Sequence, residues 1–291
     1  MGKVSRPILT GIYHRKRLFA LLDRMRERPL IWVSGPPGCG KTTLVSSYLE
    51  ARKLPCLWYQ LEAGDADPAT FFYFLGRAVQ KAVPRRRESL PFFTPEYFQG
   101  IPAFTLRYFQ NLYDRLKIPG IVVFDNYQDV SAGAPLHEII LNGLSGLPDG
   151  LHAVLISRSD PPQPMIRLQA NHQMEILGWN HLRMTLDESE GMVRLRTKKR
   201  LSRETILRMH REVDGWAAGL VLRLESERMD DREPEPAGKL VPEKVFDYFA
   251  SEIFDRTGKE VQEFLLKTAF FPQMTGRSRM RSNRAKSLFR G

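Results

Sequence analysis

The most chemically specific stretch of this sequence is a glycine-rich loop with a lysine and a threonine at fixed spacing. Gly35 opens the pattern and Gly40, Lys41 and Thr42 close it, which fits G-x-x-x-x-G-K-[ST] in full. Glycines let the backbone turn so that successive N–H groups point at one centre, and such a nest binds phosphate. A lysine can hold the β- and γ-phosphates there, and a threonine hydroxyl can coordinate Mg²⁺. The pattern therefore predicts a site for ATP or ADP with Mg²⁺.

The residues on either side of this loop predict the elements that must position it. Residues 30–33 are apolar and are typical of a buried strand, and after the loop apolar residues recur at helical spacing. The helix would present the positive end of its dipole to the phosphates. The predicted nucleotide-binding residues in the loop are Gly35, Pro36, Pro37, Gly38, Cys39, Gly40, Lys41, Thr42 and Thr43.

A carboxylate for the metal is predicted at the end of a neighbouring buried strand. Residues 121–124 are apolar and Asp125 follows them, as expected of a parallel strand that ends in the site. An Asp at this place would also suit the cap of a following helix. We predict Thr42 and Asp125 as the magnesium ligands.

The residue after this aspartate bears on hydrolysis. Most hydrolases with such a loop place a second carboxylate there to handle the attacking water, whereas this chain has Asn126. An amide can orient water but cannot accept a proton, so slow hydrolysis or none is expected. The predicted catalytic residues are Lys41, Asp125 and Asn126.

Two further apolar runs predict strands of the same sheet. One covers residues 56–61, and the other covers residues 152–156 and is followed by Arg158. If the strand ends share one edge of a parallel sheet, Arg158 would reach a γ-phosphate, but a solvated loop arginine fits the spacing equally well. Asp67 is predicted to cap a helix that has Pro68 at its first position.

Helical signals dominate from about residue 163, where the strand signals fade. Thr185 and Glu188 form a capping box that opens one helix. Residues 201–213 predict another helix, and Gly215 is well placed to end it. The segment that follows, GWAAGL, has small residues around one tryptophan and permits close approach of helices.

Composition excludes several classes of protein. The 291 residues are 42% hydrophobic and 26% charged, which is near globular averages and excludes wholesale disorder. No apolar run is long enough to span a membrane, no secretory signal region opens the chain, and two cysteines cannot form a disulfide framework. We therefore expect a cytoplasmic protein with no membrane contact.

The basic charge is concentrated at one end of the chain. The net charge is +11, and residues 277–291 hold six Lys and Arg and no acid, so that removing them leaves +5. We expect this basic tail to be disordered and to attract DNA only without sequence preference. The folded body is not expected to bind nucleic acid directly.

Several segments, in their order along the chain, resemble a known class of ATPase. They are GPPGCGKTT, WYQLEAGDADPATFFYFL, VVFDNYQD, LISRSDPP, GWAAGL and VFDYFASEIFDRTGKEVQEFLLKTAFF. Together they resemble the nucleotide-binding module of the STAND-class signal-transduction ATPases. The resemblance is strongest to the large bacterial regulators of the MalT type, many of which end in a LuxR-type DNA-binding domain.

This resemblance implies a fold and a division into domains. It implies an α/β P-loop NTPase domain, with a parallel sheet flanked by helices, over residues 1–165. A small helical domain over 166–235 and the start of a winged-helix domain over 236–276 would follow. The basic tail, 277–291, would come last.

The resemblance also implies a function and roles for named residues. Such proteins are switches that hold ADP at rest, exchange it for ATP when an inducer binds elsewhere, and then self-associate. The resemblance places residues 35–43 in the phosphate loop, Asp125 at the magnesium ion and Arg158 at the γ-phosphate as a sensor. Relatives commonly carry a second Asp where this chain has Asn126. The expected function is an ATP/ADP switch of a bacterial transcriptional regulator, with slow or no hydrolysis.

Other interpretations stay open. An AAA-type motor or a P-loop kinase would use the same loop, although a motor would normally carry Asp-Glu at positions 125 and 126. A kinase would need a lid and an acceptor region that the sequence does not reveal. Because an arginine-rich tail stands where a complete winged helix and an inducer-binding repeat array are expected, we interpret the chain as a truncated or frame-shifted product, or an excised fragment.

Overall fold

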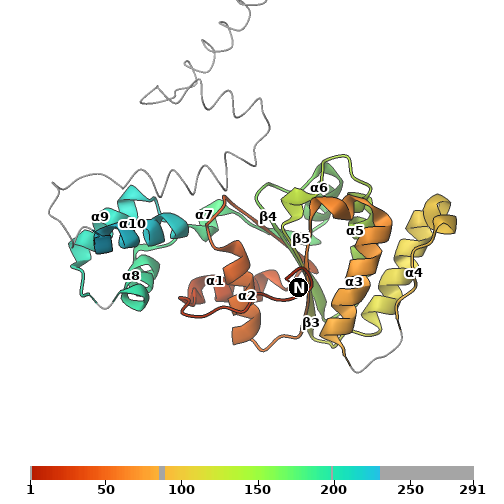
Figure 1. The fold of residues 1–291 in the computed structure, drawn as a ribbon, viewed down its shortest axis with the longest axis horizontal. Coiled ribbons are helices and arrows are strands. Elements are labelled where there is room, and N and C mark those ends of the chain that lie inside the picture. The colour runs from red at the N-terminus through yellow and green to blue at the C-terminus, as the bar shows by residue number, and fades with distance from the viewer. Residues whose placement is uncertain (1, 85–88, 198, 230–291) are drawn as a thin grey trace, which may run out of the picture. The chain divides into compact units, whose positions relative to one another are not determined.

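A parallel five-stranded sheet lies at the centre of the fold (Figure 1). The spatial order of its strands is β2-β3-β4-β1-β5. The strands are β1 (Leu30–Ser34), β2 (Cys56–Gln60), β3 (Gly120–Asp125), β4 (Leu151–Ser157) and β5 (Met174–Leu177). The first four lie where the apolar runs predict them, because parallel strands covered on both faces are apolar throughout.

The computed structural model describes residues 2–84, 89–197 and 199–229. The described residues up to 227 belong to one compact unit. The predicted winged-helix segment, 236–276, and the basic tail, 277–291, lie outside the described residues.

Helices cover both faces of the sheet, which confirms the predicted α/β architecture. Apolar side chains of α1 and α2 pack on one face, and those of α3, α4, α5 and α6 pack on the other. Their bounds are α1 (Lys16–Met25), α2 (Lys41–Ala51), α3 (Pro68–Ala82), α4 (Ile101–Tyr113), α5 (Leu136–Ser145) and α6 (Gln163–Ala170). Short 3-10 helices are η1 (Ala63–Ala66), η2 (Pro95–Gly100) and η3 (Tyr127–Asp129).

The alternation of side chains along β1 divides the core into two layers. Trp32 belongs to the aromatic-rich cluster under α3 to α6, whereas Ile31 and Val33 belong to the cluster under α1 and α2. Each fully buried side chain of this size contributes about 1.5–3 kcal/mol. The predicted start of α3 is also confirmed, because the Asp67 carboxylate accepts a hydrogen bond from the Thr70 backbone N–H at 2.8 Å.

The order of the strands differs in one respect from the prediction. The aspartate strand β3 was expected beside the phosphate-loop strand β1, but β4 lies between them and pairs with both. The three strands are parallel, and Ser34 at the end of β1 is level with Ser157 at the end of β4. Their carboxyl ends therefore meet at one edge of the sheet, where ligands bind in folds of this type.

The sheet contains a fifth strand that we did not predict from the sequence. β5 pairs in parallel with β1, so the expectation that strands cease after residue 163 is wrong for this segment. Met174 and Leu177 are buried whereas Glu175 is exposed, and four residues of this kind give a weak strand signal. The predicted end of the α/β domain at residue 165 consequently leaves out its edge strand.

A helical part follows the sheet. It contains α7 (Trp179–Leu182), α8 (Leu186–Arg196), α9 (Arg203–Glu212) and α10 (Ala217–Met229). The predicted capping box opens α8, since the Glu188 N–H donates to Thr185 Oγ1 at 3.2 Å and the Thr185 N–H donates to Glu188 Oε2 at 3.1 Å. Gly215 has a φ of +70°, and a Cβ there would lie 2.7 Å from the Met184 carbonyl oxygen, so this turn requires glycine.

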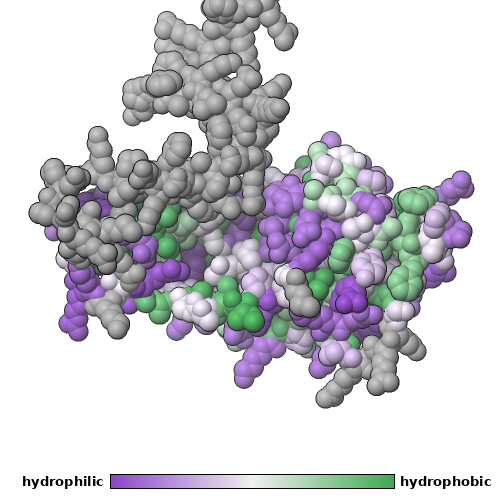
Figure 2. Space-filling view, in the orientation of Figure 1, coloured by the Kyte–Doolittle hydropathy of each residue, from purple (hydrophilic) through white to green (hydrophobic). Residues whose placement is uncertain are grey.

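Figure 2 shows polar side chains over much of one face of the molecule, with apolar side chains gathered over α4. Phe98 and Leu106 are among the exposed apolar residues of η2 and α4. No helix of the described part of the chain is both long and apolar enough to cross a membrane.

Candidate functional site

The phosphate loop connects β1 to α2. Gly38 and Gly40 have φ values of +71° and +88°, in the left-handed region that favours glycine. Gly40 is also the N-cap of α2, so that the helix begins at Lys41. The first turn of this 11-residue helix leaves backbone N–H groups unpaired and carries the positive end of the helix dipole. The loop and the first turn of α2 therefore form a favourable binding place for an anion.

The side chain of Lys41 lies against the loop itself. Its Nζ donates hydrogen bonds to the carbonyl oxygens of Gly35 at 2.6 Å and Pro36 at 3.0 Å. The residue is only 9% exposed. Burial lowers the pKa of Lys41, and the positive charge of Arg158 lowers it further. An anionic phosphate here would add to the charge compensation of the buried ammonium group.

A hydroxyl and a carboxylate meet beside this lysine, although β4 separates their strands. Thr42 Oγ1 donates to Asp125, with distances of 3.1 Å and 3.2 Å to the two carboxylate oxygens. Asp125 is buried, and burial raises its pKa, while hydrogen bonds from Asn126 and Thr42 oppose that rise. Both groups are hard oxygen donors, which suit Mg²⁺, an ion that usually completes its shell with water and nucleotide phosphates. The pair therefore fits the predicted magnesium site.

Replacing Asp125 by asparagine tests the metal assignment. We expect Asp125→Asn to lose most of the gain in ATP affinity that Mg²⁺ provides, because an amide is neutral and a poorer ligand for a divalent cation. Titration calorimetry with ATP, with and without Mg²⁺, measures that gain. Asp114→Asn is the matched control, since Asp114 is an exposed residue just after α4. An undiminished magnesium effect in a folded Asp125→Asn protein would contradict the assignment.

The residues after Asp125 connect two loops of the site. Asn126 has a φ of +59°, which asparagine tolerates, and its backbone N–H donates to Asp125 Oδ1 at 2.9 Å. Gln128, in η3, accepts a hydrogen bond at Oε1 from the backbone N–H of Arg158 at 3.0 Å. The structure thus ties the loop of Arg158 to the aspartate loop. The contribution of Gln128 was not predicted, because a single glutamine carries no motif signal.

A cavity of about 210 Å³ lies beside the loop. Its lining comes from three segments that are far apart in the sequence. The first segment contains Tyr13, which precedes α1, and Arg15, which is its N-cap. The second contains Gly38 to Gly40 of the phosphate loop and Thr43 of α2, and the third contains Met184 and Ala217 of the helical part. Most of these groups are apolar, so the cavity suits a flat ring system.

The helical part makes direct hydrogen bonds to the tip of the phosphate loop. Trp216 Nε1 donates to the carbonyl oxygen of Pro37 at 2.8 Å, and the backbone N–H of Ala218 donates to the carbonyl oxygen of Gly38 at 3.0 Å. The sequence predicts only close packing for this segment. The GWAAGL segment instead contacts the loop that is predicted to hold the phosphates.

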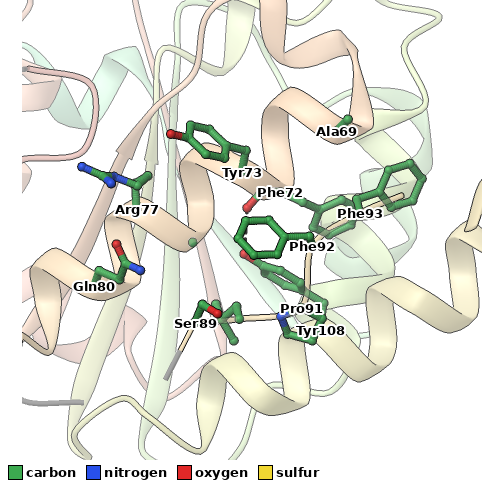
Figure 3. A pocket seen from close by; sticks show the side chains of 12 residues that line it. Ala69, Phe72, Tyr73, Arg77, Gln80, Ser89, Pro91, Phe92, Phe93 and Tyr108 are labelled. Carbon is green, nitrogen blue, oxygen red and sulfur yellow. Dashed lines mark hydrogen bonds between the residues drawn. The ribbon is translucent and has the colours of Figure 1, made fainter. Parts of the chain in front are cut away.

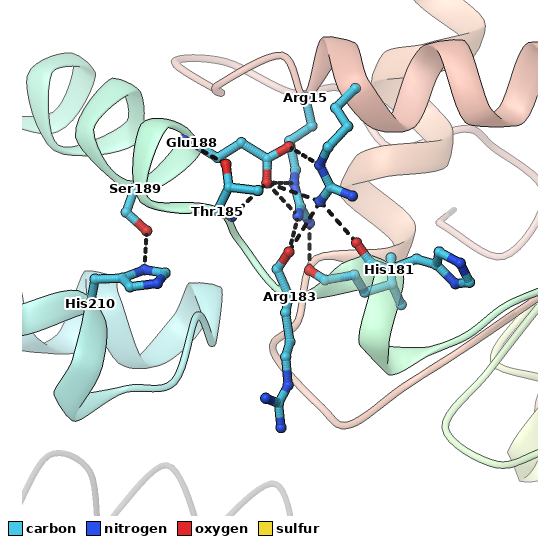
Figure 4. Close-up of polar contacts among 9 residues, drawn as sticks. Arg15, His181, Arg183, Thr185, Glu188, Ser189 and His210 are labelled. Atoms are coloured by element: carbon cyan, nitrogen blue, oxygen red, sulfur yellow. Dashed lines mark hydrogen bonds and ion pairs between the residues drawn. The ribbon is translucent and has the colours of Figure 1, made fainter. Parts of the chain in front are cut away.

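A buried ionic cluster also joins the start of the chain to the helical part (Figure 4). Arg15 Nη2 lies 2.8 Å from Glu188 Oε2, and Arg15 also donates to the carbonyl oxygens of Leu182 and Arg183 at 2.8 Å and 2.9 Å. Arg17 contacts the same carboxylate at 3.2 Å. These contacts hold the segment that contains Tyr13 beside α8, and they were not predicted from the sequence.

The sheet order, the loop and the helix it opens define the class of fold, which is that of a P-loop ATPase. The structure is similar to the Walker-type ATPase of Pyrococcus abyssi, with a TM-score of 0.58 and 15% sequence identity. The similarity covers 89% of this chain and 77% of that one.

Sequence comparison gives more specific relatives. The chain is similar to the HTH-type transcriptional regulator MalT of Serratia proteamaculans, at 28% identity over 94% of this chain and 30% of the relative. The MalT of Yersinia enterocolitica is 26% identical over 94% of this chain and 31% of its own length. A family model described as nephrocystin 3, N-terminal, matches residues 12–89, which include the phosphate loop. The predicted resemblance to MalT-type regulators is confirmed, and the chain spans less than a third of the length of these relatives.

Proposed function

We propose that this chain is the ATP- and ADP-binding switch module of a bacterial transcriptional regulator that acts in the cytoplasm. The observation that carries the proposal is the convergence of three groups at one edge of the sheet. The buried ammonium group of Lys41, the N-terminus of α2 and the Thr42–Asp125 pair all lie there. A nucleotide triphosphate with Mg²⁺ has the charge and the oxygen ligands that complement these groups.

The cavity beside the loop supports a definite orientation of the nucleotide. With the phosphates at residues 35–43, the base would enter the cavity next to Tyr13 and Met184. The nucleotide would then contact the start of the chain, the phosphate loop and the helical part at once. Because Trp216 already binds the loop tip, a change in the bound phosphates would be transmitted to the helical part.

The similarity to MalT supports the regulatory role. Those relatives are transcriptional regulators by name, and this chain matches less than a third of their length. Within such a regulator we propose an ADP-bound resting form that exchanges ADP for ATP when an inducer binds. Self-association of the ATP form would follow, and DNA contact would be indirect or, through the basic tail, without sequence preference.

Steady-state turnover tests the switch against a catalytic function. We expect slow or no ATP hydrolysis, with a kcat well below the enzyme median of about 10 s⁻¹, because Asn126 cannot accept a proton. Phosphate release from purified protein with Mg²⁺ and ATP measures it, and calorimetry must show binding of both ATP and ADP. Turnover of tens per second would instead support an AAA-type motor or a kinase.

The variant Asn126→Asp provides a second test of the same proposal. It restores a carboxylate beside Asp125, so we expect faster hydrolysis with little change in ATP affinity. Asn111→Asp is the matched control, because Asn111 lies on α4, and its side chain donates to the Arg107 carbonyl oxygen of the same helix. An unchanged rate in Asn126→Asp would show that position 126 does not limit hydrolysis.

A further inference from the structure

A glycine in the middle of α8 lies directly against the ring of Tyr13. Gly191 is an interior residue of this 11-residue helix, and a Cβ there would lie 2.6 Å from Tyr13 Cζ and nearer still to Cε2. Carbon atoms do not approach so closely, so the ring occupies the space that a side chain at position 191 would need. Glycine weakens a helix interior relative to alanine. The close approach of the ring is therefore the feature that requires glycine at this position.

Tyr13 is held in this place through a residue two positions further along the chain. Arg15 Nη2 donates to Glu188 Oε2 at 2.8 Å, and Glu188 precedes Gly191 by about one turn of α8 (Figure 4). Residues three apart lie on the same face of a helix. The segment from Tyr13 to Arg15 therefore follows one face of α8 and contacts it at both of its ends.

The ring of Tyr13 also lines the proposed nucleotide cavity. It is the one aromatic ring among the described residues around this cavity, which also include Ala217 and Ala218. Met192, the residue after Gly191, lines the cavity as well. Aromatic rings are common stacking partners of nucleobases, because every base has a π face. Tyr13 is therefore the ring on which a base in this cavity would stack.

We propose, building on the proposed function, that Gly191 is a positioning residue for the base of the bound nucleotide. Because it has no side chain, the Tyr13 ring can lie against α8 and form a wall of the cavity. A methyl group at position 191 would push the ring off the helix and away from the place where it stacks on the base. The base would in turn hold Tyr13 against α8, so that the helical part would respond to the base as well as to the phosphates.

Calorimetric titration of the full chain with ATP and with inorganic tripolyphosphate, both with Mg²⁺, separates the base from the phosphates. We expect Gly191→Ala to weaken ATP binding about tenfold, because the base loses its stacking partner, and to leave tripolyphosphate binding unchanged. Tyr13→Ala should show the same loss, whereas Tyr13→Phe, which keeps the ring, should show none. In the double variant, Gly191→Ala should add no loss to that of Tyr13→Ala, since the methyl group then meets no ring.

Gly76→Ala is the matched control. Gly76 is a helical glycine of α3, and a Cβ there would lie 3.2 Å from the hydroxyl oxygen of Tyr108, in the aromatic cavity between α3 and α4 (Figure 3). None of the residues that line that cavity lines the nucleotide cavity. We expect Gly76→Ala to change the unfolding temperature at most, with ATP and tripolyphosphate binding unchanged.

Full ATP affinity of a folded Gly191→Ala variant would overturn the proposal, and so would an equal loss of ATP and tripolyphosphate affinity. Additive losses in the double variant would also overturn it, because position 191 would then not act through the ring. If Gly191→Ala does not fold, the double variant, which relieves the clash, should fold and bind ATP as Tyr13→Ala does. A wild-type chain that binds neither ATP nor tripolyphosphate would contradict the proposed function and this inference with it, whereas the other outcomes leave the phosphate site intact.

Discussion

Replacing Lys41 by alanine is expected to weaken ATP binding at least tenfold, which corresponds to about 1.4 kcal/mol or more. The ammonium group is buried against the loop carbonyl oxygens of Gly35 and Pro36, and it is the cation that the phosphate-loop motif itself provides. In the bound state its hydrogen bonds to phosphate would be charge-assisted, and no other motif side chain can replace them. Titration calorimetry on the purified chain measures the loss.

The control for this prediction is Lys117→Ala, which removes an exposed lysine before β3 and should leave ATP affinity unchanged. Thermal unfolding of both variants shows whether each one folds. Equal ATP affinity of the wild type and a folded Lys41→Ala variant would remove the assignment of the phosphate loop, and with it the proposed function.

Replacing Glu188 by glutamine is expected to lower the free energy of unfolding by about 3 kcal/mol. Glu188 is 5% exposed and receives hydrogen bonds from Arg15 and Arg17, so the variant leaves the buried guanidinium of Arg15 without its counter-charge. Urea denaturation measures the loss. Glu190→Gln on the same helix is the control, because its partners Arg194 and Arg203 are exposed and such pairs contribute at most about 1 kcal/mol.

The same cluster predicts a direction for the dependence of stability on pH. Burial by itself would raise the pKa of Glu188, but the hydrogen bonds from Arg15 and Arg17 bring it below its ordinary value of 4.5. A carboxylate with a lowered folded-state pKa stabilises the protein above the unfolded value, and this contribution is lost as the pH falls through the folded value. We expect the gap in unfolding free energy between wild type and Glu188→Gln to narrow below pH 4.5. A gap that widens there would show that the ion pair does not stabilise the fold.

The ion pair of Arg15 with Glu188 and the hydrogen bond of Trp216 to the loop both support the walls of the proposed nucleotide cavity. Arg15 and Glu188 hold the start of the chain against the helical part, and Trp216 holds the helical part against the loop tip. Loss of either contact would alter the walls of the cavity without touching the phosphates. Glu188→Gln is therefore expected to combine lower stability with weaker nucleotide binding, whereas Lys41→Ala affects binding alone.

Local features of this protein could be predicted from the sequence because they depend on neighbouring residues. The loop from Gly35 to Thr43 needs its glycines for left-handed backbone, and the caps at Asp67 and Thr185 need side chains that reach the next turn. The four long strands were visible as apolar runs, since both faces of a parallel sheet are buried. These signals also indicated the class of fold and the residues that we predict to bind a nucleotide.

Only the tertiary structure decided which distant residues meet. In the sheet, β4 lies between β1, which leads into the phosphate loop, and β3, which ends at Asp125, and β5 is the edge strand beside β1. Trp216 donates a hydrogen bond to the carbonyl oxygen of Pro37 in the phosphate loop. Arg15 and Glu188 are 173 positions apart, and no periodic pattern relates residues at such a separation. Partners of this kind are selected by the packing of whole elements, whose energy is spread over many apolar contacts. The sequence alone therefore determined the phosphate-binding chemistry of this protein, and the fold determined what surrounds it.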